Sequence, residues 1–297
     1  MLDSKSASSK CRNVVIYTMI VISGLVCLLP LINIVSISFS GSAAVTANRV
    51  GLLPVDFTLA AYKKILEDIQ FWKSFMISVI RVFVTLVLNL VLIVPMAYVM
   101  TKNKREFKAR NIYMDILIFA MLFNGGMIPT YIVVKDLGLL DSIWALILPG
   151  AVPIFSVILL MNFFKGIPKA LEEAAIIDGA TPMDVLLKIM VPCAKPALAT
   201  VSLFSVVGSW NDFFGGLIYM RKVEDYPIMT YIQSLNINLQ ELMEQSVTSS
   251  TLENLTELSN RNLNAAKIVV AVIPLLLIYP FLQKYLISGL VMGSVKE

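Results

Sequence analysis

Long apolar runs separated by short polar segments dominate the chain. An α-helix rises 1.5 Å per residue, so about 20 apolar residues are needed to cross a hydrocarbon core about 30 Å thick. Six runs reach roughly this length, at approximately 14–38, 75–100, 111–134, 141–164, 196–220 and 267–290. The pattern therefore predicts an all-α, polytopic membrane protein with six transmembrane helices.

The polar segments between these runs predict the orientation of the chain. An even number of spans places both termini on one side, and the side richer in Lys and Arg is cytosolic. With the N-terminus inside, fourteen of the 24 Lys and Arg residues lie in inner segments and nine in outer ones. We therefore expect both termini in the cytosol, a cytosolic tail at 1–13, a first transmembrane helix at 14–38 rather than a cleaved signal, a cytosolic loop at 165–195 and an extracytoplasmic loop at 221–266. The last is either a solvated loop or a docking surface for an external partner.

The composition narrows the function classes. Apolar residues make up 58% of the 297 residues, charged residues 15%, and histidine is absent. The lack of histidine excludes Ser/His and Cys/His nucleophile systems and histidine zinc sites. The cysteines, at Cys11, Cys27 and Cys193, show no metal or disulfide spacing. No Gly-x4-Gly-Lys-Ser/Thr loop for phosphate occurs, so an ATPase that works with this chain by that route must be a separate protein.

The cytosolic segment 165–195, KGIPKALEEAAIIDGATPMDVLLKIMVPCAK, is too long for a passive turn. Pro168 suits the first turn of one short helix and Gly179 its C-terminal stop. Thr181 then resembles the N-cap of a second helix with an acid, Asp184, at its third position. An apolar stripe is expected on this second helix at i, i+3, i+4 and i+7, formed by Met183, Leu186, Leu187 and Met190.

Ile176 and Ile177 lie on the first short helix and need cover, because no lipid-spanning run surrounds them. Periodicity leaves two interpretations open. The helix pair either inserts into a groove on a partner protein or lies in the membrane interface as an amphipathic hairpin.

A residue pattern in this segment resembles a known family. The EAA loop of bacterial ABC importer permeases has the pattern E-A-A-x3-G-x9-I-x-L-P, and this sequence departs from it only in Val for Leu. The positions that carry the match are Glu173, Ala174, Ala175, Gly179, Ile189, Val191 and Pro192.

The resemblance runs from about residue 70 to the C-terminus, so 70–290 is expected to be the permease core. It includes Trp-Asn-Asp-Phe at 210–213 and the terminal Gly-Leu-Val-Met-Gly-Ser-Val-Lys at 289–296. The chain is similar to the maltose-type carbohydrate uptake permeases, in the position of the smaller membrane subunit. This implies the type I ABC importer permease fold, with a cytosolic coupling helix.

The resemblance also implies a mechanism and partners. In this family the EAA loop sits in a cleft of a cytosolic ABC ATPase, whose dimer binds ATP and Mg, so no cofactor is expected in this chain. A homologous second permease subunit, an extracytoplasmic solute-binding protein, a sugar substrate and the lipid of the plasma membrane are the expected partners, with no nucleic acid. The chain is then a transport subunit and not an enzyme. The residues implied in coupling, with Glu173 as the charged contact, are Leu171, Glu172, Glu173, Ala174, Ala175, Ile176, Asp178 and Gly179.

Polar residues inside the spans are candidates for function, because they are costly in a membrane. Arg81 is expected to snorkel to the outer interface, and Asn89 to bond across helices. Two glycines after Asn124 predict a kink or an unwound turn. Candidates for the translocation pathway are Asn124, Trp210, Asn211 and Asp212, although an interhelical hydrogen bond explains Asp212 equally well.

Three other functions compete. An ion-coupled secondary transporter predicts paired charges near the midplane and inverted repeats, and the sequence shows no clear repeat. An ABC importer for amino acids, peptides or metals is compatible with the EAA loop, whereas the segment at 210–213 and the C-terminal tail favour sugars. A membrane enzyme lacks candidate catalytic groups. The sequence does not identify the sugar.

Overall fold

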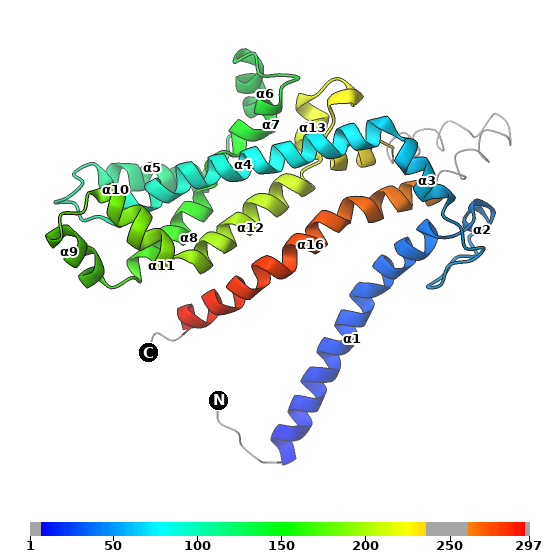
Figure 1. Cartoon of the computed structure of the whole chain (residues 1–297), viewed down its shortest axis with the longest axis horizontal. Helices are drawn as coiled ribbons and strands as arrows, with labels where there is room; N and C mark the ends of the chain where they lie inside the picture. Colours follow the sequence, from blue (N-terminus) through cyan, green and yellow to red (C-terminus); the bar gives the residue numbers. More distant parts are fainter. Residues whose placement is uncertain (1–6, 236–260, 295–297) are drawn as a thin grey trace. The chain divides into compact units, whose positions relative to one another are not determined.

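The computed structural model describes residues 7–235 and 261–294, and every regular element in these ranges is a helix (Figure 1). The long helices are α1 (Ala7–Ser38), α4 (Ile69–Thr101) and α16 (Arg261–Ser294). Among the described residues, three helices are long and apolar enough to cross a membrane, and the number reaches six if each of three bent helix pairs forms one span. Six spans are therefore compatible with the structure.

The middle spans are interrupted rather than continuous helices, and the sequence predicted only the interruption after Asn124. Asn124 and the glycines after it form an unwound turn that bends the chain by 116°, which confirms a break there. Prolines at 149 and 153 accompany a bend of 47° in the next span. The following span breaks at 212–213. The resulting pieces are α5 (Arg110–Leu122), α6 (Met127–Asp136), α7 (Ile143–Ile147), the short 3₁₀ helix η1 (Leu148–Gly150), α8 (Ile154–Lys165), α12 (Lys195–Asn211) and α13 (Phe214–Tyr219).

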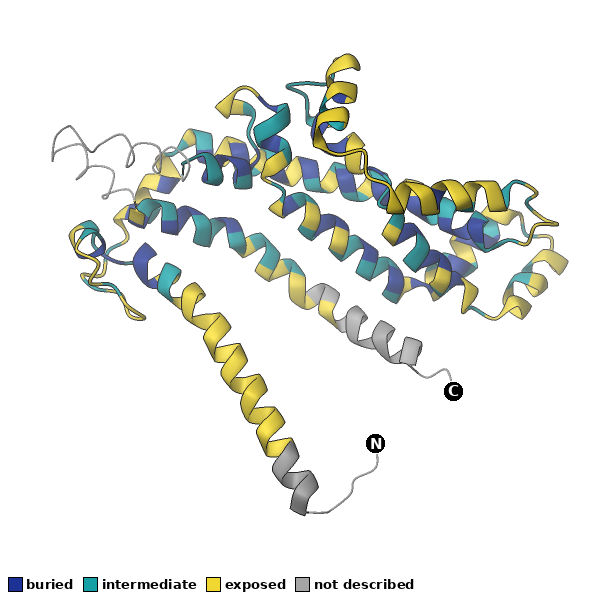
Figure 2. Ribbon diagram, turned by 180° about the vertical axis from the view of Figure 1, so that it is seen from behind, coloured by how far each residue is buried: buried dark blue, intermediate teal, exposed yellow. Residues whose placement is uncertain are grey.

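The chain divides into two compact units, residues 1–69 with 235–272 and residues 70–234 with 273–297. In the first unit, the end of α1 packs with α2 (Ser42–Thr46) around a small core of Ile37, Val45 and Ala265. Ser38 Oγ at the end of α1 lies 2.8 Å from Tyr62 Oη of α3 (Ala60–Glu67). A buried ion pair joins Lys267 to Asp68 at 2.6 Å. Most of α1 presents exposed apolar side chains, shown in yellow in Figure 2, as expected of a helix that faces lipid.

The second unit is built around α4, whose buried residues recur every three or four positions along one face. The C-terminal half of this face is apolar, with Ile93 and Ala97 fully buried. These two pack with Leu160 of α8 and Val201 of α12, and with Val185 of the 165–195 loop. The loop is therefore part of the same core as the membrane helices.

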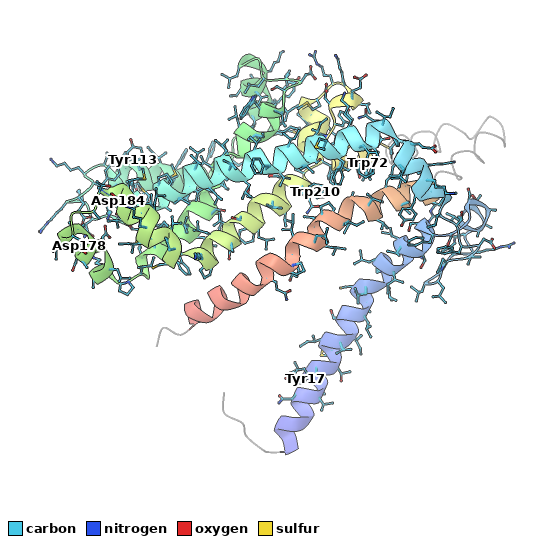
Figure 3. The ribbon with its side chains drawn as sticks, in the orientation of Figure 1. Tyr17, Trp72, Tyr113, Asp178, Asp184 and Trp210 are labelled. Atoms are coloured by element: carbon cyan, nitrogen blue, oxygen red, sulfur yellow. The ribbon has the colours of Figure 1, made fainter. Side chains whose placement is uncertain are left out.

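The other half of the buried face of α4 is polar, because its residues are Ser74, Ser78, Arg81, Thr85 and Asn89, each no more than 6% exposed. Aromatic residues flank this stripe: Phe75 packs edge-on against Trp210 with ring centroids 5.6 Å apart, in the region labelled in Figure 3. A continuous polar stripe inside a membrane protein requires partners.

The segments 236–260 and 295–297 lie outside the described residues. The choice between a solvated loop and a docking surface at 221–266 therefore stays open for most of that segment. Its first residues, including η3 (Val223–Asp225), follow α13, and residues 261–266 begin α16. The C-terminal Gly-Leu-Val-Met-Gly-Ser-Val-Lys segment ends beyond the described part of α16.

Gly216 of α13 lies in a tightly packed part of this unit, against Thr230. A Cβ placed there would lie 2.8 Å from Thr230 Cβ and 2.8 Å from Thr230 Cγ2, closer than such atoms approach in proteins. We predict that Gly216→Ala lowers the free energy of unfolding by about 1–3 kcal/mol, as overpacking does. Thermal unfolding in detergent measures this. The matched control is Gly208→Ala, whose Cβ would have no neighbour within 4 Å. Equal unfolding midpoints for the two variants would contradict the packing described here.

Candidate functional site

The 165–195 loop folds as the sequence predicted, into two short helices. The first, α9 (Lys169–Ile177), begins after Pro168 at the N-cap and ends before Gly179, whose φ of 82° requires glycine. The second begins as α10 (Pro182–Val185) behind a capping box. There the amide N–H of Asp184 donates to Thr181 Oγ1 at 3.2 Å, and the Thr181 N–H donates back to Asp184 Oδ2 at 3.2 Å.

The capping box is stable over the physiological pH range. A hydrogen bond from Lys188, reinforced by bonds from Thr181, lowers the pKa of Asp184 to about 2. A carboxyl with a lowered pKa contributes stability above its unfolded pKa of about 3.9, and the contribution is lost as the pH falls towards 2. The second helix therefore keeps its charged cap at neutral pH.

The apolar stripe predicted on the second helix is only partly covered by the rest of the protein. The helix continues as a π-helix, η2 (Leu186–Met190), and as α11 (Val191–Cys193) before it bends by 83° into α12. Leu186 and Met190 are buried in the core, whereas Met183 and Leu187 remain 59% and 56% exposed. The core covers one side of the stripe and leaves the other free.

The predicted coupling residues of α9 divide into two groups. Glu173 is exposed and has no ion pair among the described residues, and Ile176 and Ile177 beside it are 57% and 85% exposed. Ala175 packs against the core and Glu172 turns inward to the end of α4. The outward group consists of Leu171, Glu173, Ala174, Ile176, Asp178 and Gly179. Asp178 and Asp184, labelled in Figure 3, lie at the same end of this unit.

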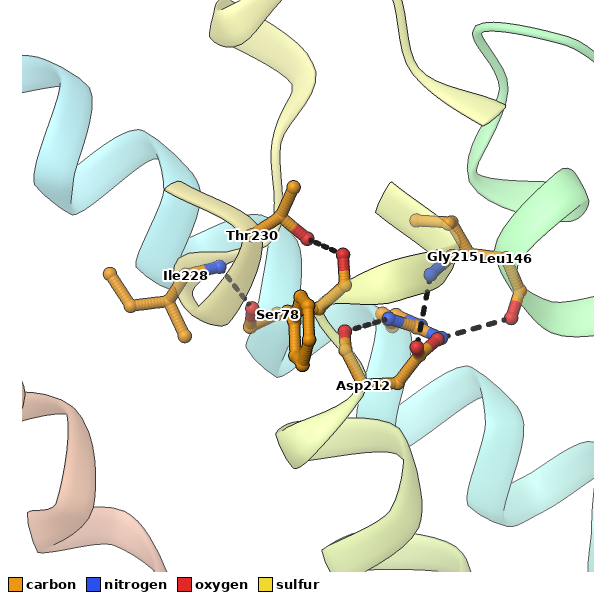
Figure 4. Close-up of polar contacts among 8 residues, drawn as sticks. Ser78, Leu146, Asp212, Gly215, Ile228 and Thr230 are labelled. Atoms are coloured by element: carbon orange, nitrogen blue, oxygen red, sulfur yellow. Dashed lines mark hydrogen bonds and ion pairs between the residues drawn. The ribbon is translucent and has the colours of Figure 1, made fainter. Parts of the chain in front are cut away.

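The second feature of the site is the partnership between α4 and the broken spans. Arg81 is 3% exposed, so the prediction that it snorkels to the interface is wrong. Its guanidinium donates to Asp212 Oδ2 at 2.5 Å, to the Asp212 carbonyl oxygen at 3.2 Å and to the Leu146 carbonyl oxygen at 3.2 Å (Figure 4). Arg81 thus bonds the carbonyl oxygens beside two of the breaks.

Neighbouring residues complete the same arrangement. The Ile228 N–H donates to Ser78 Oγ at 2.8 Å, the Gly215 N–H donates to Asp212 Oδ1 at 3.0 Å, and Thr230 Oγ1 donates to the Phe213 carbonyl oxygen at 2.9 Å (Figure 4). The bond to Gly215 satisfies an amide in the first turn of α13, which the break at 212–213 leaves without a helical partner. The interhelical hydrogen bond considered for Asp212 is therefore present.

Asn89 bonds across helices, as predicted. Its side chain lies 2.9 Å from Ser205 Oγ of α12. In the amide orientation that satisfies both of its ends, Asn89 also donates to the Ala151 carbonyl oxygen at 2.8 Å. This residue supports the break between η1 and α8 in the same way that Arg81 supports its neighbours.

A cavity of about 300 Å³ lies where these elements meet. Within the part of the chain that the structure describes, Arg81 Nε and Thr85 Oγ1 are buried there without a hydrogen-bond partner. Backbone breaks are tolerated at membrane depth where they are buried or line a cavity. The polar residues that line this one are Arg81, Thr85, Asn89, Ser156, Ser205, Ser209, Asp212 and Tyr219.

The structure does not bring the four predicted pathway residues together. Asp212 lines the cavity, Trp210 is buried against Phe75, and Asn211 is exposed. Asn124 is exposed in the α5–α6 turn, where its Oδ1 accepts the Gly126 N–H at 2.9 Å. The sequence analysis singled out Arg81 and Asn89 without placing them in the pathway, and it missed the hydroxyl residues of the cavity. The spacing of Ser, Arg, Thr and Asn at 78, 81, 85 and 89 could have revealed their common face.

Residues 93–291 match a family described as binding-protein-dependent transport system inner membrane component. The chain belongs to this family. It is 40% identical to Protein LplC of Bacillus subtilis (strain 168), covering 92% of this chain and 90% of that one. It is 37% identical to the polygalacturonan/rhamnogalacturonan transport system permease protein YtcP of the same organism, covering 96% and 98%.

A solved structure agrees with this assignment. A chain of a bacterial ABC transporter involved in the import of the acidic polysaccharide alginate matches with a TM-score of 0.84 and 35% identity, covering 96% of this chain and 99% of that one. The resemblance to ABC importer permeases and the all-helical type I permease fold are thus confirmed. This family member is a multi-pass membrane transport subunit and not an enzyme.

The role of Arg81 in holding the breaks can be measured. Arg81→Met removes three hydrogen bonds and leaves the Asp212 carboxylate without its cation. We predict a loss of about 2–3 kcal/mol in unfolding free energy, below the 3–5 kcal/mol of a fully buried pair because the Asp212 side chain is 35% exposed. Thermal unfolding in detergent is the measurement.

Arg49→Met is the matched control, because Arg49 is exposed. The double variant Arg81→Met/Asp212→Asn lacks the unpaired charge and should be less destabilised than Arg81→Met alone. Loss of stability no greater than in the Arg49 variant would refute the structural role.

Proposed function

We propose that this chain is the permease subunit of an ATP-driven carbohydrate importer that takes up oligosaccharides. Two observations support the substrate class: the named relative YtcP transports polygalacturonan or rhamnogalacturonan, and the structural neighbour imports alginate. Both matches cover nearly the whole of both chains. Fragments of acidic polysaccharides are therefore the first substrates to test.

The proposed partners are a homologous second permease subunit, an extracytoplasmic solute-binding protein and a cytosolic ABC ATPase dimer. The family description itself refers to a binding protein. In this proposal ATP and Mg bind to the ATPase dimer, and this chain contributes neither a nucleotide site nor a cofactor. Both termini and the 165–195 loop lie in the cytosol, and 221–266 faces outward, as the distribution of Lys and Arg favours.

The observation that carries the coupling assignment is the outer surface of α9. Ile176 and Ile177 are uncovered, and Glu173 presents an unpaired carboxylate beside them. An apolar patch with a single charge at its edge suits a protein groove that supplies a basic residue. Of the two interpretations left open by the sequence, this pattern favours the partner groove over an interfacial hairpin.

The packing of the loop supports its use as a lever. Val185, Leu186 and Met190 of the second helix are buried in one core with α4, α8 and α12. Closely packed protein interiors move as units and transmit displacement. Closure of the ATPase dimer would then shift these helices together and exchange an inward-facing arrangement for an outward-facing one, as a two-state equilibrium biased by ATP.

The pathway for the sugar is proposed to include the cavity beside α4. Its hydroxyl, amide and carboxylate groups are the kinds that bind sugar hydroxyls. Of the predicted pathway residues, Asp212 contributes directly. Trp210 supports the cavity from the core, and Asn124 and Asn211 retain a proposed role only at exposed surfaces.

The Arg81–Asp212 pair is the kind of intramembrane charge pair that an ion-coupled transporter predicts. It does not favour that function here. The hydrogen bonds from Arg81 to two backbone carbonyl oxygens give the pair a structural purpose.

The coupling assignment predicts that Glu173→Gln impairs transport. In the assembled importer we expect substrate-stimulated ATP hydrolysis and uptake to fall by about tenfold or more, since a charged interface contact is lost. Glu67→Gln is the matched control, an exposed glutamate on α3, which the proposed orientation places outside the membrane. Gly179→Ala should act in the same direction because φ is 82° there. Wild-type transport in both loop variants would refute the coupling role.

The substrate class predicts the result of a gene deletion. Cells lacking this gene should lose uptake of an oligosaccharide, tested first with fragments of alginate and polygalacturonan and then with neutral oligosaccharides. Uptake is measured with labelled sugars, and a plasmid copy of the gene should restore it. Retained uptake of every oligosaccharide together with loss of a cation flux would refute the carbohydrate assignment.

A further inference from the structure

A second ion pair joins α9 to the cytosolic end of α4. The ammonium group of Lys102 pairs with the Glu172 carboxylate, and Tyr98 Oη donates to Glu172 Oε1 at 3.0 Å. The same ammonium lies 4.3 Å from the centre of the Tyr98 ring, within the range of a cation–π contact. Three side chains therefore meet at one point where α9 touches α4.

This contact is more enclosed than a surface ion pair. The side chains of Lys102 and Glu172 are 18% and 22% exposed. Burial lowers the pKa of Lys102, and the nearby Glu106 opposes that shift. A partly desolvated cation needs its counter-charge more than an exposed one does, so the pair holds the two helices in a defined relation.

The contact of Glu172 with Lys102 and Tyr98, called the tie below, joins α9 to the helix that supports the cavity. Helix α4 is a single element of 33 residues. Tyr98 and Lys102 lie at and just beyond its cytosolic end, whereas Arg81 and Asn89 hold the breaks around the cavity farther along the same helix. A displacement applied at Lys102 would reach the cavity through one continuous helix.

We propose that Glu172 is a positioning residue that fastens the coupling helix α9 to Lys102 and Tyr98, so that movement of α9 is delivered to α4 as well as to α8 and α12. This rests on the proposed coupling role of the loop and goes beyond it. The family resemblance makes Glu173 the charged contact with the ATPase, and Glu173 is exposed on the outward face of α9. Glu172 lies on the inward face and contacts the membrane helix instead.

Loss of the tie should uncouple the partners without separating them. Glu173 and the isoleucines remain available to the ATPase when Glu172 is neutralised, because they lie on the other side of α9. Helix α9 then stays joined to α8 by the chain at 166–168 and to the core by Ala175. ATP hydrolysis would continue while α4 responds less.

The experiment follows ATP-driven change at the cavity and needs no identified sugar. Cys11, Cys27 and Cys193 are replaced by serine, and Ser209→Cys places one thiol at the cavity lining. The importer is purified with its partner subunits. The rate of maleimide labelling is compared without nucleotide and with MgATP plus orthovanadate, and ATP hydrolysis is measured in parallel.

Without further substitution, nucleotide should change the labelling rate. In Glu172→Gln and in Lys102→Met that nucleotide-dependent change should shrink about five- to tenfold, the size of a typical coupling between sites, with ATP hydrolysis retained. The charge exchange Lys102→Glu/Glu172→Lys and the conservative Lys102→Arg should restore it. Lys104→Met, an exposed lysine of the same loop, is the matched control.

An unchanged labelling response in both single variants would overturn the positioning role. A response that the charge exchange fails to restore, while Lys102→Arg is normal, would show that Glu172 acts on another partner and would also overturn it. No nucleotide response in the parent protein would instead refute the proposed coupling function itself. Association of the single variants with the ATPase, measured by co-purification, separates loss of coupling from loss of assembly.

Discussion

Backbone groups inside a membrane must find partners within the protein, since each unsatisfied group costs several kcal/mol there. The spans that contain η1 and the 212–213 break interrupt their own helical bonding. Arg81 compensates for both interruptions by donating hydrogen bonds to the carbonyl oxygens of Leu146 and Asp212. Its charge is in turn neutralised by the Asp212 carboxylate. The broken spans, the cavity between them and the buried cation thus require one another.

This constraint explains why α4 is long and unbroken while its neighbours are interrupted. One helix that supplies side-chain hydrogen bonds at positions 81 and 89 can hold several breaks in place. Breaks without such a partner would be unstable, and the polar stripe without the breaks would be an uncompensated cost. The result is a polar cavity with a rigid wall on one side and irregular backbone on the other.

The sequence predicts those features that depend on neighbouring residues. Gly179 and Thr181 specify where α9 ends and α10 begins, because a positive φ and a capping box are local requirements. It predicted Arg81 wrongly, since its partner Asp212 lies 131 residues away. The same applies to the inward turn of Glu172 towards Lys102. Apolar run length places the spans, but it does not predict the 116° bend between α5 and α6.

The two ends of α4 use related chemistry with different properties. At the cavity, a planar guanidinium forms several directed bonds and is almost completely buried, which suits a contact that stays fixed through the cycle. At the C-terminal end of α4, a lysine on a flexible stem meets a glutamate in a less buried position, which suits a contact with a helix that we propose to move. With a rigid contact at the cavity and a flexible contact at the 165–195 loop, α4 would transmit a displacement from the loop to the cavity without disturbing the breaks it supports.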